Sequence, residues 1–136
     1  MTDSPTPNPT DTGLLQIGEV ADRVGLSLRT VRYYEEQKLV VPETRTEGGF
    51  RLYTERQIDR LLLIKKMKPL GFSLDEMRTM FAARETLSDP DASTEDQGAA
   101  AATIAGFAHQ VDERTTKMRR TLEQSEQFAR ELRDNE

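Results

Sequence analysis

The chain has 136 residues, with 19 Lys or Arg, 24 Asp or Glu and no cysteine, and its formal net charge is −5. This length suits one modest domain and an appendage, because single cores occupy about 100–200 residues. The absence of cysteine excludes disulfides, thiolate metal sites and cysteine nucleophiles. No apolar run approaches the roughly 20 residues of a membrane span, and the N-terminus lacks the basic start and apolar stretch of a signal peptide. We therefore expect a cytoplasmic protein.

The charge is divided unevenly along the chain. Residues 14–84 hold 13 Lys or Arg and 10 Asp or Glu side chains, whereas the other residues hold 6 and 14. Such asymmetry is typical of a module that faces a polyanion, joined to one that is solvated or binds a partner. Chance scatter around a neutral mean is the alternative, and the charges alone leave it open.

Two short helices are the first elements that the sequence predicts. Apolar residues at helical spacing predict a helix that begins at Ile17 and ends at Gly25. Ser27 is a suitable N-cap for a second helix over residues 28–36, which buries Tyr34. The side chains that this second helix turns outward are Arg29, Thr30, Arg32 and Tyr33. Two helices joined by a tight glycine turn form a helix-turn-helix unit, and its second helix fits the major groove of DNA.

A small two-stranded wing is predicted over residues 39–53. β-Branched and aromatic residues flank the sequence Glu47-Gly48-Gly49, and the glycines supply the positive φ that a hairpin loop needs. Arg45 and Arg51 stand on either side of this tip, with Tyr53 beyond them. The wing would therefore carry cationic and hydrogen-bonding groups within reach of DNA phosphates.

Two further helices follow, each opened by a capping box. Thr54 with Gln57 begins the first of them, and Ser73 with Glu76 begins the second. The first ends at Pro69-Leu70-Gly71, which a helix does not continue through. Their apolar faces are expected to pack against the helix-turn-helix unit.

A long helix is predicted over residues 104–132, which contain no proline. A narrow apolar seam on a polar helix is unstable alone, so the seam is expected to pack against a second copy. Thr115 and Ser125 interrupt it. Basic side chains in the middle of the helix and acidic ones beyond them favour an antiparallel pair. The apolar and small seam residues are Ile104, Ala108, Val111, Met118, Leu122, Ala129 and Leu132. The alternative is a helix that folds back on its own globular part.

The predicted fold class is mainly α, a winged helix-turn-helix domain followed by a long coiled-coil dimerisation helix. Pro-rich residues 1–13, with one hydrophobic side chain, cannot offset the entropy of ordering. Acidic residues and small ones, broken by Pro90 and Gly98, predict a linker before the last helix. The parts are a disordered tail over 1–13, the DNA-binding domain over 14–84, the linker over 85–100 and the dimerisation helix over 101–136.

Three runs in order, TVRYYE, GGFRLYT and LGFSLDEM, make residues 15–84 resemble the DNA-binding domain of the MerR family of bacterial transcription regulators. The resemblance implies a winged helix-turn-helix dimer that binds a pseudo-palindromic promoter operator, distorts the DNA and meets RNA polymerase at the promoter. It also implies DNA contacts by Arg29, Arg32 and Tyr33 of the recognition helix and by Arg45, Arg51 and Tyr53 of the wing.

Simpler roles compete with these contacts. Arg32 could pair with Glu35 or Glu36 on its own helix, and Tyr53 could pack the wing against the next helix. Lys65, Lys66 and Lys68 could form an ordinary solvated face.

The chain departs from the metal-sensing and drug-sensing members of the family. Metal-sensing relatives carry cysteines beside the long helix, and here there are none, while His109 is the only histidine. We therefore expect no metal site, no cofactor and no separate effector domain. A lone histidine without cysteine also gives no nucleophile and base for an enzyme.

Three functions compete. The leading one is a transcription regulator without its own ligand domain. The second is a regulator that senses a small ligand in a pocket between the linker, the fourth helix and the seam. That pocket could be lined by Phe81, Phe107 and Phe128. The third is a protein-interaction adaptor or antitoxin-like module that acts through the long helix.

Overall fold

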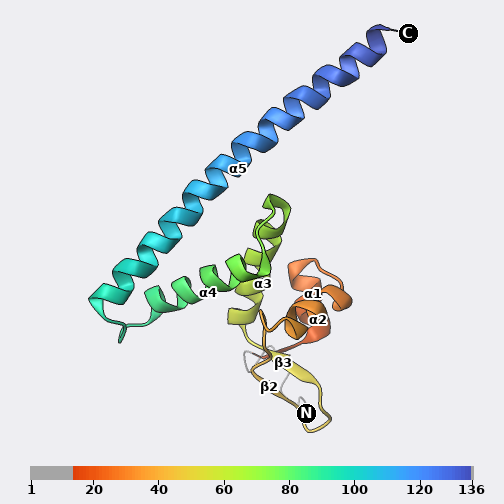
Figure 1. Ribbon diagram of the computed structural model, residues 1–136. Coiled ribbons are helices and arrows are strands. Elements are labelled where there is room, and N and C mark those ends of the chain that lie inside the picture. Colours follow the sequence, from red (N-terminus) through yellow and green to blue (C-terminus); the bar gives the residue numbers. More distant parts are fainter. Residues whose placement is uncertain (1–13, 136) are drawn as a thin grey trace, which may run out of the picture. The chain divides into compact units, whose positions relative to one another are not determined.

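The structure, a computed structural model, describes residues 14–135. The tail predicted over residues 1–13 lies outside the described residues. The chain divides into two compact units, Met1–Met77 and Arg78–Glu136. The described part is mainly helical, as the sequence predicts, with a small sheet in the first unit (Figure 1). None of its helices is both long enough and apolar enough to cross a membrane.

The helix-turn-helix unit has the predicted bounds. Helix α1 spans Ile17–Val24 and ends at Gly25, whose φ of 72° is the left-handed conformation that glycine adopts without strain. Helix α2 spans Leu28–Glu36, and the Ser27 hydroxyl accepts a hydrogen bond from the backbone N–H of Thr30 at 3.0 Å. The glycine turn and the serine cap are therefore both confirmed.

The wing belongs to a three-stranded antiparallel sheet. Strand β2 spans Thr44–Arg45, strand β3 spans Arg51–Tyr53, and both belong to the predicted wing. The sequence did not predict strand β1, Leu15–Gln16, which pairs with β3 in the strand order β1-β3-β2. The buried side chain of Leu15 explains this strand, because pairing with β3 satisfies the backbone of a segment that must enter the core.

Helix α3 spans Glu55–Met67, and a turn of 3₁₀-helix over Lys68–Leu70 follows it. Helix α4 spans Leu74–Ser88. Both predicted capping boxes are present, since Gln57 accepts from the N–H of Thr54, and Ser73 and Glu76 bond each other's backbone. Buried apolar residues of the first unit come from α1, α2, α3, β3 and the segment after α2, and include Val20, Val24, Val31, Tyr34, Leu39, Tyr53, Ile58, Leu61, Ile64 and Met67.

The last helix begins earlier than the sequence predicted. Helix α5 spans Thr94–Asp134, so only residues 89–93 separate it from α4, whereas the acidic linker was expected over 85–100. Ser93 caps α5 by accepting from the N–H of Asp96, and Glu95 and Asp96 lie in its first turn. Acidic side chains favour a helix N-terminus, so the composition that indicated a linker stabilises the start of a helix instead.

Candidate nucleic-acid interface

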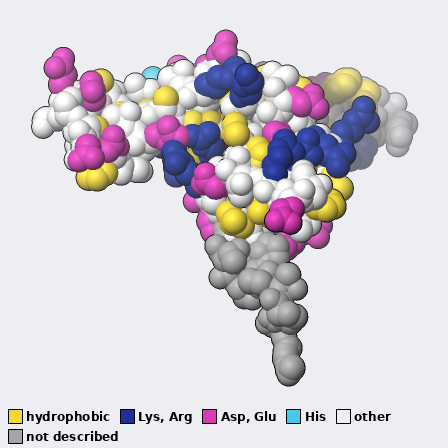
Figure 2. Space-filling model, turned by 90° about the horizontal axis from the view of Figure 1, so that it is seen from below, with side chains coloured by type: hydrophobic (Ala, Val, Ile, Leu, Met, Phe, Trp, Pro, Cys, Tyr) yellow, Lys and Arg dark blue, Asp and Glu magenta, His cyan; other side chains and the backbone are white. Residues whose placement is uncertain are grey.

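Lys and Arg side chains form several groups on one face of the molecule, with hydrophobic and acidic side chains between them (Figure 2). A mixed surface of this kind does not identify a binding face by charge alone. The residues of α2 and of the wing, rather than charge, define the candidate interface.

The outward face of α2 is formed as the sequence predicts. Arg29, Arg32 and Tyr33 are exposed, whereas Tyr34 is buried. The Tyr33 and Tyr34 rings meet edge to face with centroids 5.3 Å apart. A buried ring thus orients an exposed one, and Tyr33 presents 44% of its surface to solvent. Thr30 is half-buried, and its hydroxyl accepts a hydrogen bond from that of Ser27.

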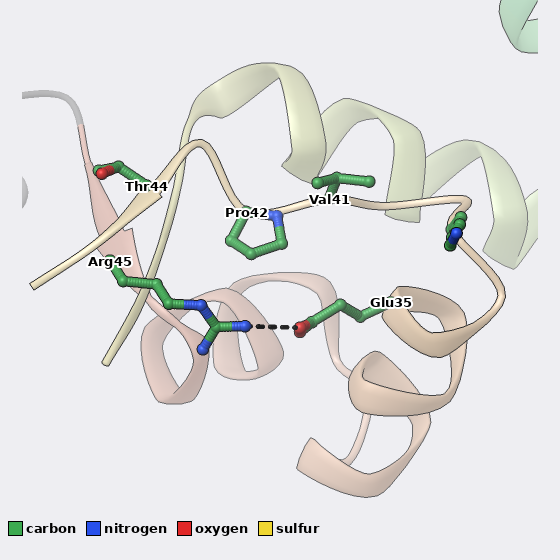
Figure 3. A pocket seen from close by; sticks show the side chains of 6 residues that line it. Glu35, Val41, Pro42, Thr44 and Arg45 are labelled. Carbon is green, nitrogen blue, oxygen red and sulfur yellow. Dashed lines mark ion pairs between the residues drawn. The ribbon is translucent and has the colours of Figure 1, made fainter. Parts of the chain in front are cut away.

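The two wing arginines converge on one carboxylate. Arg51 Nε donates to Glu35 Oε1 at 2.6 Å, and Arg45 Nη2 lies 3.7 Å from the same oxygen (Figure 3). Arg45 Nη1 also donates to the carbonyl of Gly49 at the wing tip, at 3.3 Å. The Glu35 side chain is only 13% exposed. Its contact raises the pKa of Arg51, so the guanidinium stays charged.

Tyr53 does not have the exposure expected of a DNA contact. Its side chain is 0% exposed, and its hydroxyl donates to Glu35 Oε2 at 2.8 Å. Burial, and secondarily the hydrogen bond to Glu35, raise the pKa of Tyr53. Tyr53 is therefore a buried residue whose hydroxyl joins the wing to α2, whereas its competing interpretation was packing against the helix after the wing.

Glu35 and Phe50 were not among the predicted site residues. Glu35 was considered only as a partner of Arg32, but among the described residues Arg32 makes no ion pair, and Glu35 bonds across 16 and 18 positions of sequence. No local spacing reveals such contacts. Phe50 is 63% exposed beside the Gly-Gly tip, and an aromatic residue at a hairpin tip is a signal that the sequence did contain.

Two other basic side chains bond backbone carbonyls of the fold. Lys65 Nζ donates to the carbonyl of Val24 at 2.6 Å and so caps the C-terminus of α1. Arg60 Nη1 donates to the carbonyl of Leu39 at 3.2 Å, and burial lowers the pKa of Arg60. Lys65 is thus more than part of a solvated face, because its hydrogen bond joins α3 to the end of α1.

An open cavity of about 410 Å³ lies where α2 meets the wing. Figure 3 shows Arg45 reaching toward Glu35 across it, with Val41 and Pro42 on the opposite side. Lys38, at its rim, has a φ of 61°, a left-handed conformation that is strained for lysine. The cavity is small and combines both signs of charge with apolar carbon.

No group of three or more His, Asp or Glu side chains within the described residues is placed to hold a metal ion. His109 Nε2 lies 3.4 Å from Glu113 Oε1 on the next turn of α5, and both side chains are mostly exposed. Of the three phenylalanines considered for a ligand pocket, Phe81 and Phe107 are buried and Phe128 is exposed.

Solved structures share the fold. A transcriptional regulator of the MerR family from Bacillus cereus aligns with 28% identity and a TM-score of 0.56, over 81% of this chain and 73% of that chain. HiNmlR, a MerR family regulator lacking the sensor domain and bound to promoter DNA, aligns with a TM-score of 0.62 over 81% of this chain and 79% of its own. Its identity is 22%, so this similarity concerns the fold alone.

Curated relatives match about half of the chain. The HTH-type transcriptional regulator ZntR of Escherichia coli is 45% identical over 71 residues, which are 52% of this chain and 50% of ZntR. The regulator CueR of Yersinia pestis is 43% identical over 68 residues, 50% of this chain and 49% of CueR. The chain thus spans about half the length of these relatives.

Two family profiles cover nearly all of the described residues. The profile described as MerR HTH family regulatory protein matches residues 15–84, and the profile described as MerR, DNA binding matches residues 58–133. The first begins at strand β1 and the second reaches the end of α5. The chain therefore belongs to the MerR family of helix-turn-helix regulatory proteins.

Proposed function

We propose that the protein is a sequence-specific DNA-binding transcription regulator that places α2 in the major groove and the wing on the flanking backbone. One observation carries the proposal. The exposed arginines and tyrosine of α2 stand beside a ribbon whose two arginines are tied to that same helix by Glu35. Base-reading and phosphate-binding groups are thereby held in one rigid piece.

The α2 side chains have the chemistry for base edges. Arginine donates two hydrogen bonds to the O6 and N7 of guanine, and tyrosine offers a hydroxyl and an apolar ring. Arg29 lies near the start of the helix and Arg32 one turn later, so both lie on the exposed side of a helix whose N-terminal half enters the groove. The wing arginines bind phosphates and set the register. The proposed contacts are Arg29, Thr30, Arg32, Tyr33, Arg45 and Arg51.

The long helix supports a homodimer. On α5, Met118, Leu122 and Leu132 are exposed in the single chain, although they lie on the predicted seam. An antiparallel pair with its axis at Met118 would set Ile104 beside the partner's Leu132. It would also set the small Ala108 beside the partner's Phe128, a large exposed side chain next to the seam. This register thus places apolar side chains against each other at one layer and a large side chain against a small one at the other.

A two-fold dimer reads two half-sites, so the operator is expected to be a pseudo-palindrome. The solved complex of HiNmlR with promoter DNA supports a promoter as the target of this fold. At a promoter the dimer would distort the DNA and meet RNA polymerase, and it would act in the cytoplasm. The chain has no proposed catalytic role.

Sequencing the DNA that the purified full chain retains from a pool of random duplexes tests the proposal. The expected result is one enriched motif with two inverted half-sites. Equal retention of all sequences would overturn it. Retention of a protein partner and no DNA would favour the adaptor function. A small ligand that raises the melting temperature of the protein without changing its affinity for DNA would favour a sensor.

A further inference from the structure

The carboxylate of Glu35 has both oxygens engaged by the wing. Oε1 accepts from Arg51 Nε at 2.6 Å, and Oε2 accepts from the Tyr53 hydroxyl at 2.8 Å. The side chain is 13% exposed, so solvent screens these bonds less than it screens a surface ion pair. Glu35 therefore connects the wing to α2 through two hydrogen bonds.

Arg51 is held in a way that leaves part of its guanidinium unused. Only Nε of Arg51 bonds Glu35, and within residues 14–135 its two terminal nitrogens have no hydrogen bond. The guanidinium is planar, so fixing Nε also fixes the plane in which these nitrogens donate. About a third of the side chain is exposed, and a phosphate oxygen can reach it.

We propose that Glu35 is a positioning residue for DNA binding, which orders Arg51 through Nε so that its terminal nitrogens are aimed at a DNA phosphate. This inference rests on the proposed function. An arginine on a free wing would lose rotamer freedom when it binds the backbone, and that loss weakens binding. Here Glu35 restricts the rotamers of Arg51 before DNA binds, so less rotamer freedom is lost on binding.

The sign of the effect separates positioning from simple charge. Replacing Glu35 by Gln removes a negative charge beside the proposed DNA path, and charge alone predicts tighter binding to every duplex. Positioning predicts the opposite, weaker binding. Affinity for the operator and for a scrambled duplex should both fall by about 3- to 30-fold, the cost of ordering one or two long side chains, because a phosphate contact is made on either sequence.

The experiment compares full-length wild type, Glu35→Gln and Glu36→Gln on the selected operator and on a scrambled duplex of equal length. Glu36 is the matched control, because it is the exposed neighbour on α2 and the charge change is identical. Affinity for both duplexes should fall for Glu35→Gln, whereas Glu36→Gln should leave it unchanged or raise it slightly. Arg51→Ala is then measured in the wild-type and Glu35→Gln backgrounds, and its cost should be smaller in the second.

Thermal melting separates stability from positioning. Tyr53→Phe removes the other Glu35 bond but leaves that to Arg51, so it should lower the melting temperature and keep the affinity for both duplexes. An unchanged or higher affinity of Glu35→Gln for both duplexes, or an equal cost of Arg51→Ala in both backgrounds, would overturn the inference. A wild-type chain that prefers no duplex would instead overturn the proposed function itself.

Discussion

The hydroxyl of Tyr53 donates to Glu35 Oε2 across 2.8 Å, from the buried end of strand β3 to the last turn of the recognition helix. The ring is fully buried. This bond joins the two parts of the proposed interface at a point that DNA does not reach. It therefore affects stability directly and DNA binding only through the position of the wing.

Alkaline pH tests this bond. The pKa of Tyr53 is raised above its ordinary value of 10.0, chiefly by burial, so above that pH the unfolded chain loses the proton while the folded chain keeps it. The unfolded state then binds fewer protons, and stability falls as pH rises. The free energy of unfolding of wild type should approach that of Tyr53→Phe by up to about 1.4 kcal/mol per pH unit above about pH 10.

Urea unfolding of both proteins over this pH range gives the measurement. Tyr33→Phe, which removes an exposed hydroxyl, is the control and should follow wild type. Parallel curves for wild type and Tyr53→Phe through alkaline pH would contradict the assignment.

Lys38 offers a test of backbone strain. Its φ of 61° follows the end of α2, where Leu39 N–H bonds the carbonyl of Tyr34 and Lys38 N–H bonds that of Glu35. This is the glycine position of a Schellman motif. Lys38→Gly should raise the free energy of unfolding by about 0.5–1 kcal/mol, whereas Lys38→Ala keeps the Cβ and should not. Urea titration decides it, and equal effects of the two variants would refute the strain.

Local sequence signals made much of the fold predictable. Contacts between residues that are far apart in the sequence could not be predicted. The Gly25 turn, the Ser27 cap and the capping boxes lie within a few residues of the helices they start or end, so the sequence predicted α1 and α2 correctly. Strand β1 is two residues long and pairs with β3 nearly forty positions later, and no periodicity shows in two residues. Ser93 with Asp96 is a local signal for the early start of α5, whereas the acidic composition of this segment favours a linker.

The candidate site, like the fold, has features that local spacing predicted and others that depend on distant contacts. Helical spacing predicted which α2 residues face outward, and Arg29, Arg32 and Tyr33 are exposed. The same spacing suggested a pairing of Arg32 with Glu35, whereas Glu35 bonds the wing. Strand alternation could not distinguish a Tyr53 that faces DNA from one that faces the core, because that depends on where α2 lies. Whether the seam residues of α5 meet a partner stays a prediction.

The bond from Lys65 to the carbonyl of Val24 should stabilise the helix-turn-helix. Lys65→Ala leaves the end of α1 without this charged donor, and we expect a loss of about 1 kcal/mol, discounted for partial exposure. Lys66→Ala is the control, since that lysine is exposed on the same helix. Thermal melting of the two variants gives the comparison. Equal melting temperatures would show that Lys65 is only part of a solvated face.

Dimerisation through α5 is tested at Leu122. This seam side chain is 59% exposed in the single chain, and burying a leucine against a partner contributes about 1.5–3 kcal/mol. Leu122→Asp loses that contribution and adds a charge that must be desolvated, so the variant should sediment as a monomer and bind the operator weakly. Gln124→Asp adds the same charge outside the seam and should remain dimeric. A dimeric Leu122→Asp would contradict the seam.

Operator binding by Arg32→Ala is the most direct test of the central claim, that the exposed face of α2 reads DNA sequence. The account predicts a loss of about 1–3 kcal/mol on the selected operator and relaxed specificity at one base pair in each half-site. Arg51→Ala is the comparison, since a phosphate contact should weaken operator and scrambled duplex alike and flatten the salt dependence. Wild-type affinity and unchanged specificity in Arg32→Ala, and equally in Arg29→Ala and Tyr33→Ala, would contradict the claim.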